Sequence, residues 1–358
     1  LSDYMLIIAL LGGGIWFTFK LGFIQVRGFG EGMRRTFGGL FSKKGNADKD
    51  GMSSFQALAT AIAAQVGTGN IAGAATALAI GGPGAIFWMW IAAFLGMATI
   101  FGEAVLAQKY KQVGSDGEIT GGPVYYIRAA FKGTFGKVLA GIFAVLIILA
   151  LGFMGNAVQS NSIAAAFHTA FGVPQAAVGV VVALIALFVF VGGMQRIAKV
   201  TETIVPIMAA FYILGALIVI IYNYKNIPYA FQAIVVGAFN PSAVSGGAVG
   251  ATLKLALTKG VARGLFSNEA GMGSTPHAHA VAKVDHPVEQ GFVAMIGVFI
   301  DTFIVLNLTA FVIITTKSIP SGKTGAELSQ YAFSTLYGKG GRSEEHTSEL
   351  QSPIHLVC

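Results

Sequence analysis

Glycines and polar side chains interrupt a long apolar stretch near residue 70. The sequence AAQVGTGNIAGAA, residues 63–75, brings together three glycines and three amide or hydroxyl side chains: Gly67, Gly69 and Gly73, with Gln65, Thr68 and Asn70. Each glycine costs about 1 kcal/mol in a helix interior relative to alanine, so this composition predicts a broken helix at 66–70. Inside a lipid bilayer, the freed backbone groups need partners within protein or a water-filled cavity. We therefore expect the break to line a binding site.

The chemistry of such a break suits a zwitterion together with a monovalent cation. Freed N–H groups at the start of the following half-helix bind an anion such as a carboxylate, helped by the positive end of the helix dipole. Freed carbonyl oxygens at the end of the preceding half-helix suit a hard cation such as Na⁺. Close helix packing is the alternative, because Gly69 and Gly73 also form a GxxxG pair.

A similar pattern recurs about 200 residues later. Residues 70–76 read N-x-A-G-x-x-T, and residues 268–274 read N-x-A-G-x-x-S. We expect a second broken helix there, near 264–276, with interruptions at Gly264 and at Gly271 to Pro276. The two segments lie five spans apart and therefore run in opposite directions. Interrupted helices at matching places in two oppositely oriented halves indicate an inverted-repeat transporter with its site near the membrane midplane.

The composition is that of an integral membrane protein. Of the 358 residues, 54% are hydrophobic and 11% charged, against about 25% charged in soluble domains. A membrane-crossing helix needs about 20 apolar residues, and the sequence predicts eight such spans: 3–23, 53–81, 86–107, 137–167, 176–192, 201–222, 248–281 and 291–316. Alternate loops are basic, which places them in the cytoplasm and the N-terminus outside. The net charge of +7 therefore indicates membrane topology and predicts no nucleic-acid partner.

The predicted organisation has four parts. Residues 1–24 form a separate N-terminal transmembrane helix, 53–224 a first five-helix repeat and 244–316 the start of a second, inverted repeat. Residues 342–358 read RSEEHTSELQSPIHLVC, which resembles a translated sequencing adapter. We interpret this segment as a non-native tail and leave it out of the fold.

Three longer blocks carry a family resemblance. The sequences VGTGNIAGAATALAIGGPGAIFWMW, FGEAVLAQKY and GLFSNEAGMGSTPHAHA resemble the alanine or glycine:cation symporters of bacteria and archaea, over about residues 1–338. The resemblance implies an all-α, leucine-transporter-like inverted-repeat fold with an extra N-terminal helix. It also implies three spans beyond the eighth, so that about eight of eleven would be present and the chain would be truncated at its C-terminus.

The resemblance also assigns binding residues at both breaks. It implies that the N–H groups of Thr68 and Gly69 bind the substrate carboxylate, while Phe266 covers the substrate side chain. Further substrate contacts are expected from Ser267, Asn268 and, on the long fourth span, Gln159, for which an interhelical hydrogen bond is the alternative. The implied cation ligands are carbonyl groups and one amide side chain: Ala63, Gln65, Val66 and Asn70.

Asp301 is a further candidate, found from the residues themselves. An ionisable group inside a span indicates function by default, and no residue of the eighth span neutralises it. We predict a cation-coupling or proton-sensitive role, with a structural pairing to Arg263 or Lys254 as the alternative. Glu103 lies near the end of the third span, where solvation or an ion pair is the simpler explanation.

These features predict a secondary active transporter in the plasma membrane of a prokaryote. It would import a small neutral amino acid, alanine or glycine, with Na⁺ as the coupling ion and without another cofactor. Proton coupling on the same fold is the first alternative, and a channel is a lesser one. An enzyme is not expected, because the sequence has no Ser/His/Asp or paired-carboxylate constellation. The sequence predicts no oligomeric state.

Overall fold

The computed structural model describes residues 2–38, 59, 62, 66–115, 119–240 and 253–337. The predicted cation ligands Ala63 and Gln65 and the predicted tail at 342–358 lie outside these residues, as do parts of the predicted repeats. The described chain is almost entirely helical. Its one sheet is an antiparallel hairpin of β1 (Gln112–Val113) and β2 (Ile119–Thr120).

The helices follow in chain order. The first half contains α1 (Ser2–Lys20), α2 (Ile24–Arg27), α3 (Phe29–Phe37), the π-helix η2 (Gly69–Gly73), α5 (Ala74–Gly81), α6 (Gly84–Lys109), α7 (Pro123–Ala130), α8 (Gly133–Ile147), the π-helix η3 (Ile148–Gly155) and α9 (Asn156–Phe171). The second half contains α10 (Gln175–Val191), α11 (Gly193–Tyr222), the short η4 (Tyr224–Asn226), α12 (Ile227–Phe239), α14 (Leu253–Asn268), α15 (Pro276–Val281), α16 (Pro287–Phe299), the π-helix η5 (Ile300–Leu306), α17 (Asn307–Thr315), the short η6 (Ile319–Ser321) and α18 (Gly325–Tyr337).

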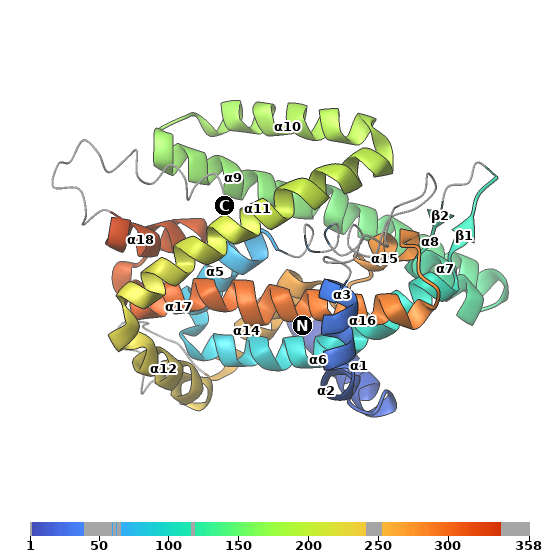
Figure 1. The fold of residues 1–358 in the computed structure, drawn as a ribbon, viewed down its shortest axis with the longest axis horizontal. Helices are drawn as coiled ribbons and strands as arrows, with labels where there is room; N and C mark the ends of the chain where they lie inside the picture. Colours follow the sequence, from blue (N-terminus) through green and yellow to red (C-terminus); the bar gives the residue numbers. More distant parts are fainter. Residues whose placement is uncertain are drawn as a thin grey trace.

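Helix α6 runs through the packed body below α16 and α17 in Figure 1, and it contacts α1, α12, α14 and α16. Apolar residues lie around most of its circumference, which is typical of a helix surrounded by protein. Small residues allow the close contacts: a Cβ added to Gly260 of α14 would lie 2.4 Å from the carbonyl oxygen of Ala85. In the most apolar part of α6, two thirds of the residues (67%) are buried. Helix α6 can therefore act as a rigid support for its neighbours.

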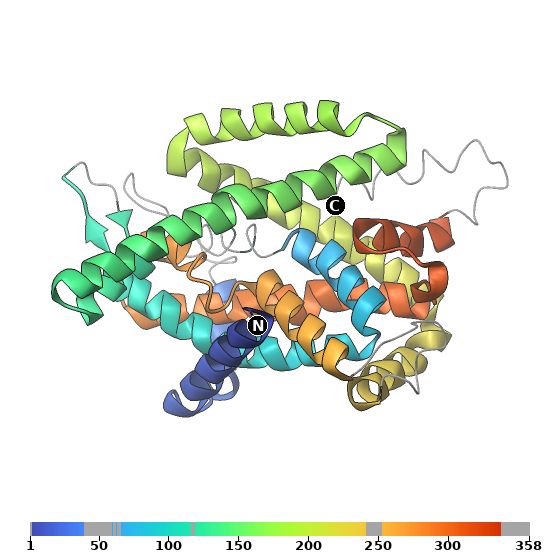
Figure 2. The ribbon, with the colours of Figure 1, turned by 180° about the vertical axis from the view of Figure 1, so that it is seen from behind.

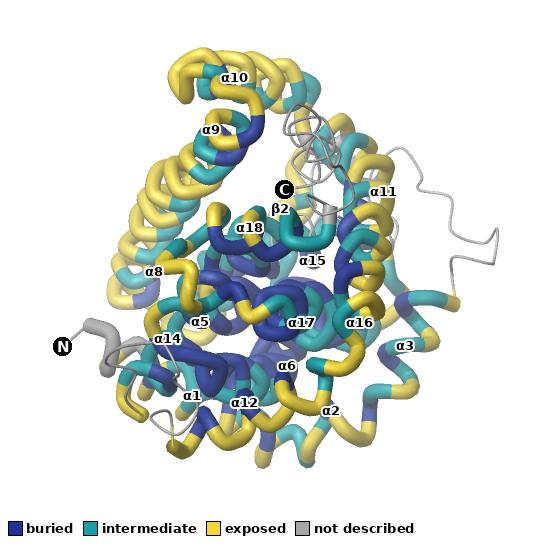
Figure 3. Tube along the Cα trace, turned by 90° about the vertical axis from the view of Figure 1, so that its left-hand side faces the viewer, coloured by how far each residue is buried: buried dark blue, intermediate teal, exposed yellow. Residues whose placement is uncertain are grey.

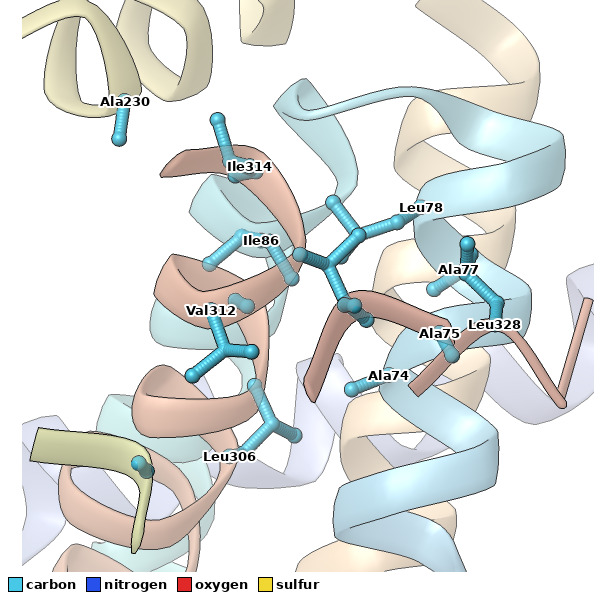
Figure 4. Packing of buried hydrophobic residues seen from close by; sticks show 14 of the residues in the cluster. Ala74, Ala75, Ala77, Leu78, Ile86, Ala230, Leu306, Val312, Ile314 and Leu328 are labelled. Atoms are coloured by element: carbon cyan, nitrogen blue, oxygen red, sulfur yellow. The ribbon is translucent and has the colours of Figure 1, made fainter. Parts of the chain in front are cut away.

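A buried apolar cluster joins the first half of the chain to the second. Leu78 of α5, Ile86 of α6, Leu306 of η5 and Ile314 of α17 are fully buried or nearly so. Figure 4 shows these side chains converging, with Leu328 of α18 beside Ala75 and Ala77. The cluster fixes α5, which follows the first predicted break, against η5, which carries Asp301, and against α17.

The helices α8 to α10 form an outer layer, and α11 leads from it to the body, where Tyr212, Ala216 and Val219 are buried in the same apolar cluster. Figure 1 shows α9 and α10 above the body, and Figure 3 shows that most of this layer is exposed. In the most apolar stretch of residues 133–171, which has a mean hydropathy of 2.7, only 6% of the residues are buried. An apolar helix that protein does not cover is suited to lipid.

The helical, apolar architecture confirms an all-α membrane protein. By length and composition, four helical stretches in the described chain could each cross a bilayer: 84–109, 133–171, 199–222 and 287–315. The eight predicted spans and the leucine-transporter topology stay predictions. The structure adds helices that the apolar pattern did not indicate, namely α2, α3, α12 and α18.

One predicted interruption is wrong. Gly264 lies inside α14, which continues unbroken to Asn268. A Cβ at Gly264 would lie 3.2 Å from the Cα of Met89 on α6. This glycine therefore serves the close contact between two helices, and the break begins five residues later.

Candidate functional site

The first break is a change of helix type near Gly69. The chain bends at Val66 and Gly67, and the π-helix η2 begins at Gly69, directly before α5. The side chain of Asn70 turns back, and its Oδ1 accepts a hydrogen bond of 3.1 Å from the N–H of Gly67. N–H groups in the first turn of a helix have no acceptor within that helix. The wide turn of a π-helix frequently marks a functional site.

The second break separates α14 from α15 through residues 269–275. Three residues there have positive φ: Glu269 (55°), Gly271 (85°) and Gly273 (77°). A left-handed backbone conformation has little energetic cost for glycine, whereas it is strained for glutamate. Asn268 caps the end of α14, because its Oδ1 accepts a hydrogen bond of 3.1 Å from the N–H of Ala270.

The two breaks touch each other. A Cβ added to Gly69 would lie 3.0 Å from the Cα of Ser267 and 3.3 Å from its Oγ. Figure 2 shows α5, in light blue, beside α14, in light orange, and the two helices are in contact. A side chain at this position would require Ser267 to shift by a few tenths of an ångström, so Gly69 has the close-packing role that its spacing suggested as well as a place in the break.

Asp301 links both breaks. It lies in η5 and is fully buried. Its Oδ1 accepts hydrogen bonds from Nδ2 of Asn70 (2.7 Å) and Oγ of Ser267 (3.1 Å), while Oδ2 accepts one from Oγ1 of Thr302 (2.7 Å). Asn70 also donates to the Asp301 carbonyl oxygen at 2.9 Å, and Asn268 donates to Thr302 at 3.4 Å. We call Asn70, Ser267, Asn268, Asp301 and Thr302 the Asp301 cluster.

The charge of the cluster has no protein counterion within the described chain. Every described donor to the Asp301 carboxylate is a neutral amide or hydroxyl, and no ion pair joins it to Arg263 or Lys254. A buried carboxylate is costly unless a positive charge compensates it. The surrounding carboxylate, hydroxyl and amide oxygens form a hard donor set that fits Na⁺.

The structure gathers some predicted site residues and separates others. Ser267, Asn268, Asn70 and Asp301 form one cluster, and Gly69 packs against it. Val66 is buried at the bend and Thr68 is half-buried. Phe266 is 39% exposed, so its role over the substrate stays a prediction.

Gln159 does not join the cluster in this structure. It is exposed on α9, in the outer layer, and α9 contacts α10, η3 and α18. A substrate contact from Gln159 would require the outer layer to approach the body, and the role stays a prediction.

Two polar residues near the site were missed or misinterpreted. Thr302 contributes a hydroxyl to Asp301. Glu103 was expected to be solvated or ion-paired, but it is buried, and its Oε2 accepts a hydrogen bond of 2.9 Å from the N–H of Gly271. The signal is a small and polar face on α6: Thr99 lies one turn and Gly96 two turns before Glu103, and both lie against residues 268–271.

Comparison with known proteins identifies the family. The Sodium:alanine symporter family matches residues 1–343. The chain belongs to this family. Its match covers both breaks and the whole Asp301 cluster.

Several curated relatives are similar over most of the chain. The sodium/alanine symporter AgcS of Methanococcus maripaludis is 45% identical over 346 residues, which cover 95% of this chain and 74% of that protein. The amino-acid carrier protein AlsT of Bacillus subtilis is 44% identical, covering 94% and 70%. The probable sodium/glutamine symporter GlnT of the same organism is 44% identical, covering 93% and 68%. Family membership places the chain among sodium-coupled amino acid transporters of the membrane and not among enzymes.

Proposed function

We propose that the chain imports alanine or glycine together with Na⁺ by alternating access. The observation that carries the proposal is the Asp301 cluster, a buried carboxylate held by both breaks with no described cationic side chain beside it. A bound Na⁺ would compensate the carboxylate and would use oxygens from the first break, the second break and η5. Asn70, Ser267 and Asp301 are the side chains that we assign to the cation.

The substrate would lie against the first break. We assign its carboxylate to the N–H groups of Thr68 and Gly69, at the start of the helix that runs from Gly69 to Gly81. The positive end of the helix dipole favours an anion there. The contact between Gly69 and Ser267 leaves little width at the crossing of the breaks, which supports a substrate no larger than alanine.

Coupling follows from the shared position of the two ligands. Na⁺ at Asp301 orders Asn70, whose Oδ1 holds the N–H of Gly67 and thereby the geometry of the first break. A cation near the substrate carboxylate also attracts it. Each ligand should raise the affinity for the other, because coupling between two sites is reciprocal.

A proton on Asp301 could compensate the charge in place of Na⁺. The neutral donors around the carboxylate permit either ion, so proton coupling is retained as the alternative. The two ions differ in coordination: Na⁺ uses several oxygens at once, whereas a proton occupies one carboxylate oxygen.

The test is uptake of labelled alanine and glycine by the full-length protein in proteoliposomes. An inward Na⁺ gradient, an inward proton gradient and no gradient are compared, with unlabelled glutamine as a competitor. Accumulation driven by Na⁺ alone, and unaffected by glutamine, is the expected result. Accumulation with a proton gradient alone would identify H⁺, and not Na⁺, as the coupling ion. The absence of gradient-driven accumulation would contradict the proposal.

A further inference from the structure

The short helix α15, which follows the second break, is attached to α6 mainly through one glutamine. Gln108 is 5% exposed, and its Nε2 donates to the carbonyl oxygens of His279 and Ala282 (2.7 Å for Ala282), with the carbonyl of Ala280 at 3.3 Å. Lys111 donates to Oε1 of Gln108 (2.8 Å) and to the Ala282 carbonyl (3.2 Å). We call Gln108 and Lys111, with these three carbonyl groups, the α15 clasp.

The clasp replaces hydrogen bonds that a continuous helix would make. The last carbonyl groups of a helix have no partner within it, and a cationic side chain there is favourable. Because α15 ends at Val281, these carbonyls would otherwise be buried without partners. Gln108 therefore determines where the end of α15 can lie.

The remaining contacts of α15 are also polar or small. The ring Nδ1 of His277 donates to the carbonyl of Gly121 (2.8 Å), and that of His279 donates to Oε1 of Gln290 (2.9 Å). Ala280 is buried against Gly121, where an added Cβ would lie 2.5 Å from the Ala280 Cβ. The buried apolar residues of α15 are Pro276 and Ala280, so moving α15 would uncover no large aliphatic or aromatic side chain that is now buried.

The other half of the broken helix is attached differently. On α14, Val261 and Leu265 are buried in an apolar cluster with Ala92 of α6 and Ile7 of α1. Separating apolar surfaces costs about 25 cal/mol per Å². A hydrogen bond that water can replace contributes only about 0.5–1.5 kcal/mol. Helix α14 is therefore fixed on α6, while α15 is held by contacts that water can exchange.

The segment between the two halves allows rotation. Gly271 and Gly273 have positive φ, and glycine crosses between backbone regions more easily than other residues. Glu103 holds the N–H of Gly271 and also faces the N–H of Gly273, so the part anchored to α6 extends to Gly273 and the rotation lies between there and α15. Motion of α15 would leave Ser267 and Asn268 in place.

We propose that Gln108 is a positioning residue for the transport cycle. It holds α15 against α6, and release of the α15 clasp lets this segment move and opens the Asp301 cluster towards the side of the membrane where α6 ends. This inference rests on the proposed function, because it assumes that the cluster binds the transported ligands. The basic loop after α6 predicts that this side is the cytoplasm.

Cysteine accessibility tests the clasp. Ala282→Cys is introduced into a cysteine-free background of the full-length protein, because Ala282 is fully buried. Inside-out vesicles that contain this variant are treated with a membrane-impermeant maleimide. Gln108→Leu removes the amide, and Gln108→Glu keeps its size but removes the donors. Both should raise the labelling rate about tenfold, and Lys111→Ala about threefold. Gln25→Leu is the matched control, because Gln25 is also buried and donates a hydrogen bond, to Thr18 at 2.9 Å, far from α15.

Na⁺-dependent alanine binding is measured on the same preparations. The inference predicts that the Gln108 variants still bind alanine in a Na⁺-dependent manner, transport it more slowly and label faster, while Gln25→Leu labels at the original rate. Unchanged labelling in the Gln108 variants with intact binding would overturn the inference alone. An equal increase in the labelling rate by Gln25→Leu would also overturn it, because the faster labelling would then reflect a general loosening of the protein and not release of the α15 clasp. Absence of Na⁺-dependent binding in the unmodified protein would overturn the proposed function itself.

Discussion

The two breaks share a sequence pattern but have different backbones. Gly73 and Gly271 occupy the same position of the N-x-A-G pattern, yet Gly73 is helical (φ −66°) and Gly271 is left-handed (φ +85°). The hydroxyl of Thr76 bonds within its own helix, to the carbonyl of Ala72, whereas the hydroxyl of Ser274, at the matching position, bonds to Glu269. After the bend at Val66 and Gly67, the first break continues into one helix with a π-helical start, whereas the second break separates two described helices.

The difference shows how each break is supported. The first break is closed by its own residue, Asn70, which bonds to the N–H of Gly67. The second break frees more backbone groups, and α6 supplies their partners through Glu103 and Gln108. A nearly rigid first break beside a hinged second break suits a site in which one wall stays fixed while the other opens.

Asp301, where the breaks meet, should show the largest effect. Asp301→Asn keeps the shape and loses the charge that a cation would compensate. We expect Na⁺-driven alanine uptake to fall about a hundredfold, equivalent to about 2.8 kcal/mol, because hydrogen bonds to charged groups contribute about 1.5–3 kcal/mol. Uptake into proteoliposomes measures this. Asp285→Asn, an exposed carboxylate outside the cluster, should retain full uptake, and equal loss in both variants would contradict a specific role for Asp301.

Alanine substitutions of Gly73 and Gly271, which occupy the same position of the N-x-A-G pattern, test directly whether the two breaks have different backbone conformations. Gly271→Ala forces alanine into a left-handed backbone and places a Cβ 2.6 Å from Leu10, so we expect about 2 kcal/mol of destabilisation. Gly73→Ala should be neutral or stabilise by about 0.5–1 kcal/mol, because its backbone is helical and the nearest atom is 3.7 Å away. Thermal unfolding in detergent compares them. Equal destabilisation would mean that the breaks do not differ in this way.

The matched asparagines compare the two breaks as cation supports. Asn70 makes two hydrogen bonds to Asp301, at 2.7 and 2.9 Å, whereas the side-chain amide of Asn268 donates to Thr302, at 3.4 Å. We expect Asn70→Ala to raise the Na⁺ concentration for half-maximal alanine binding about tenfold, or about 1.4 kcal/mol. Asn268→Ala should raise it about threefold, or about 0.7 kcal/mol. The reverse order would assign the cation to the second break.

The smallest effect should come from the contact between the breaks. Gly69→Ala requires Ser267 to move by a few tenths of an ångström, and we expect alanine affinity to fall about twofold, or about 0.4 kcal/mol. Gly67→Ala is the control, because an added Cβ meets no described atom within 4 Å. Binding titrations of the two variants distinguish contact at Gly69 from a general demand for glycine in this segment.

Much of the site could be predicted from short patterns. The repeated N-x-A-G sequence singled out two segments about 200 residues apart, which lie in contact in the structure, and the charge of Asp301 in an apolar span singled it out. A charged group in such a span is costly, and its presence therefore indicates compensation by partners.

The rest depended on contacts that one sequence does not contain. Glycine content alone did not distinguish Gly264, which allows close packing, from Gly271, which lies in the second break, because φ depends on neighbouring helices. The burial of Glu103 and the carbonyl contacts of Gln108 depend on residues more than 160 positions away. The exposure of Gln159 likewise follows from the position of the outer layer.

A double-mutant cycle tests the central claim, that both breaks serve one cation at Asp301, most directly. Na⁺ is titrated against alanine binding for Asn70→Ala, Ser267→Ala and the double variant of the full-length protein. Since both side chains donate to Oδ1 of Asp301, their effects should be non-additive by about 1 kcal/mol, roughly a fivefold difference from the product of the single effects. Strictly multiplicative effects would show that the two breaks act on Na⁺ independently and would contradict the account.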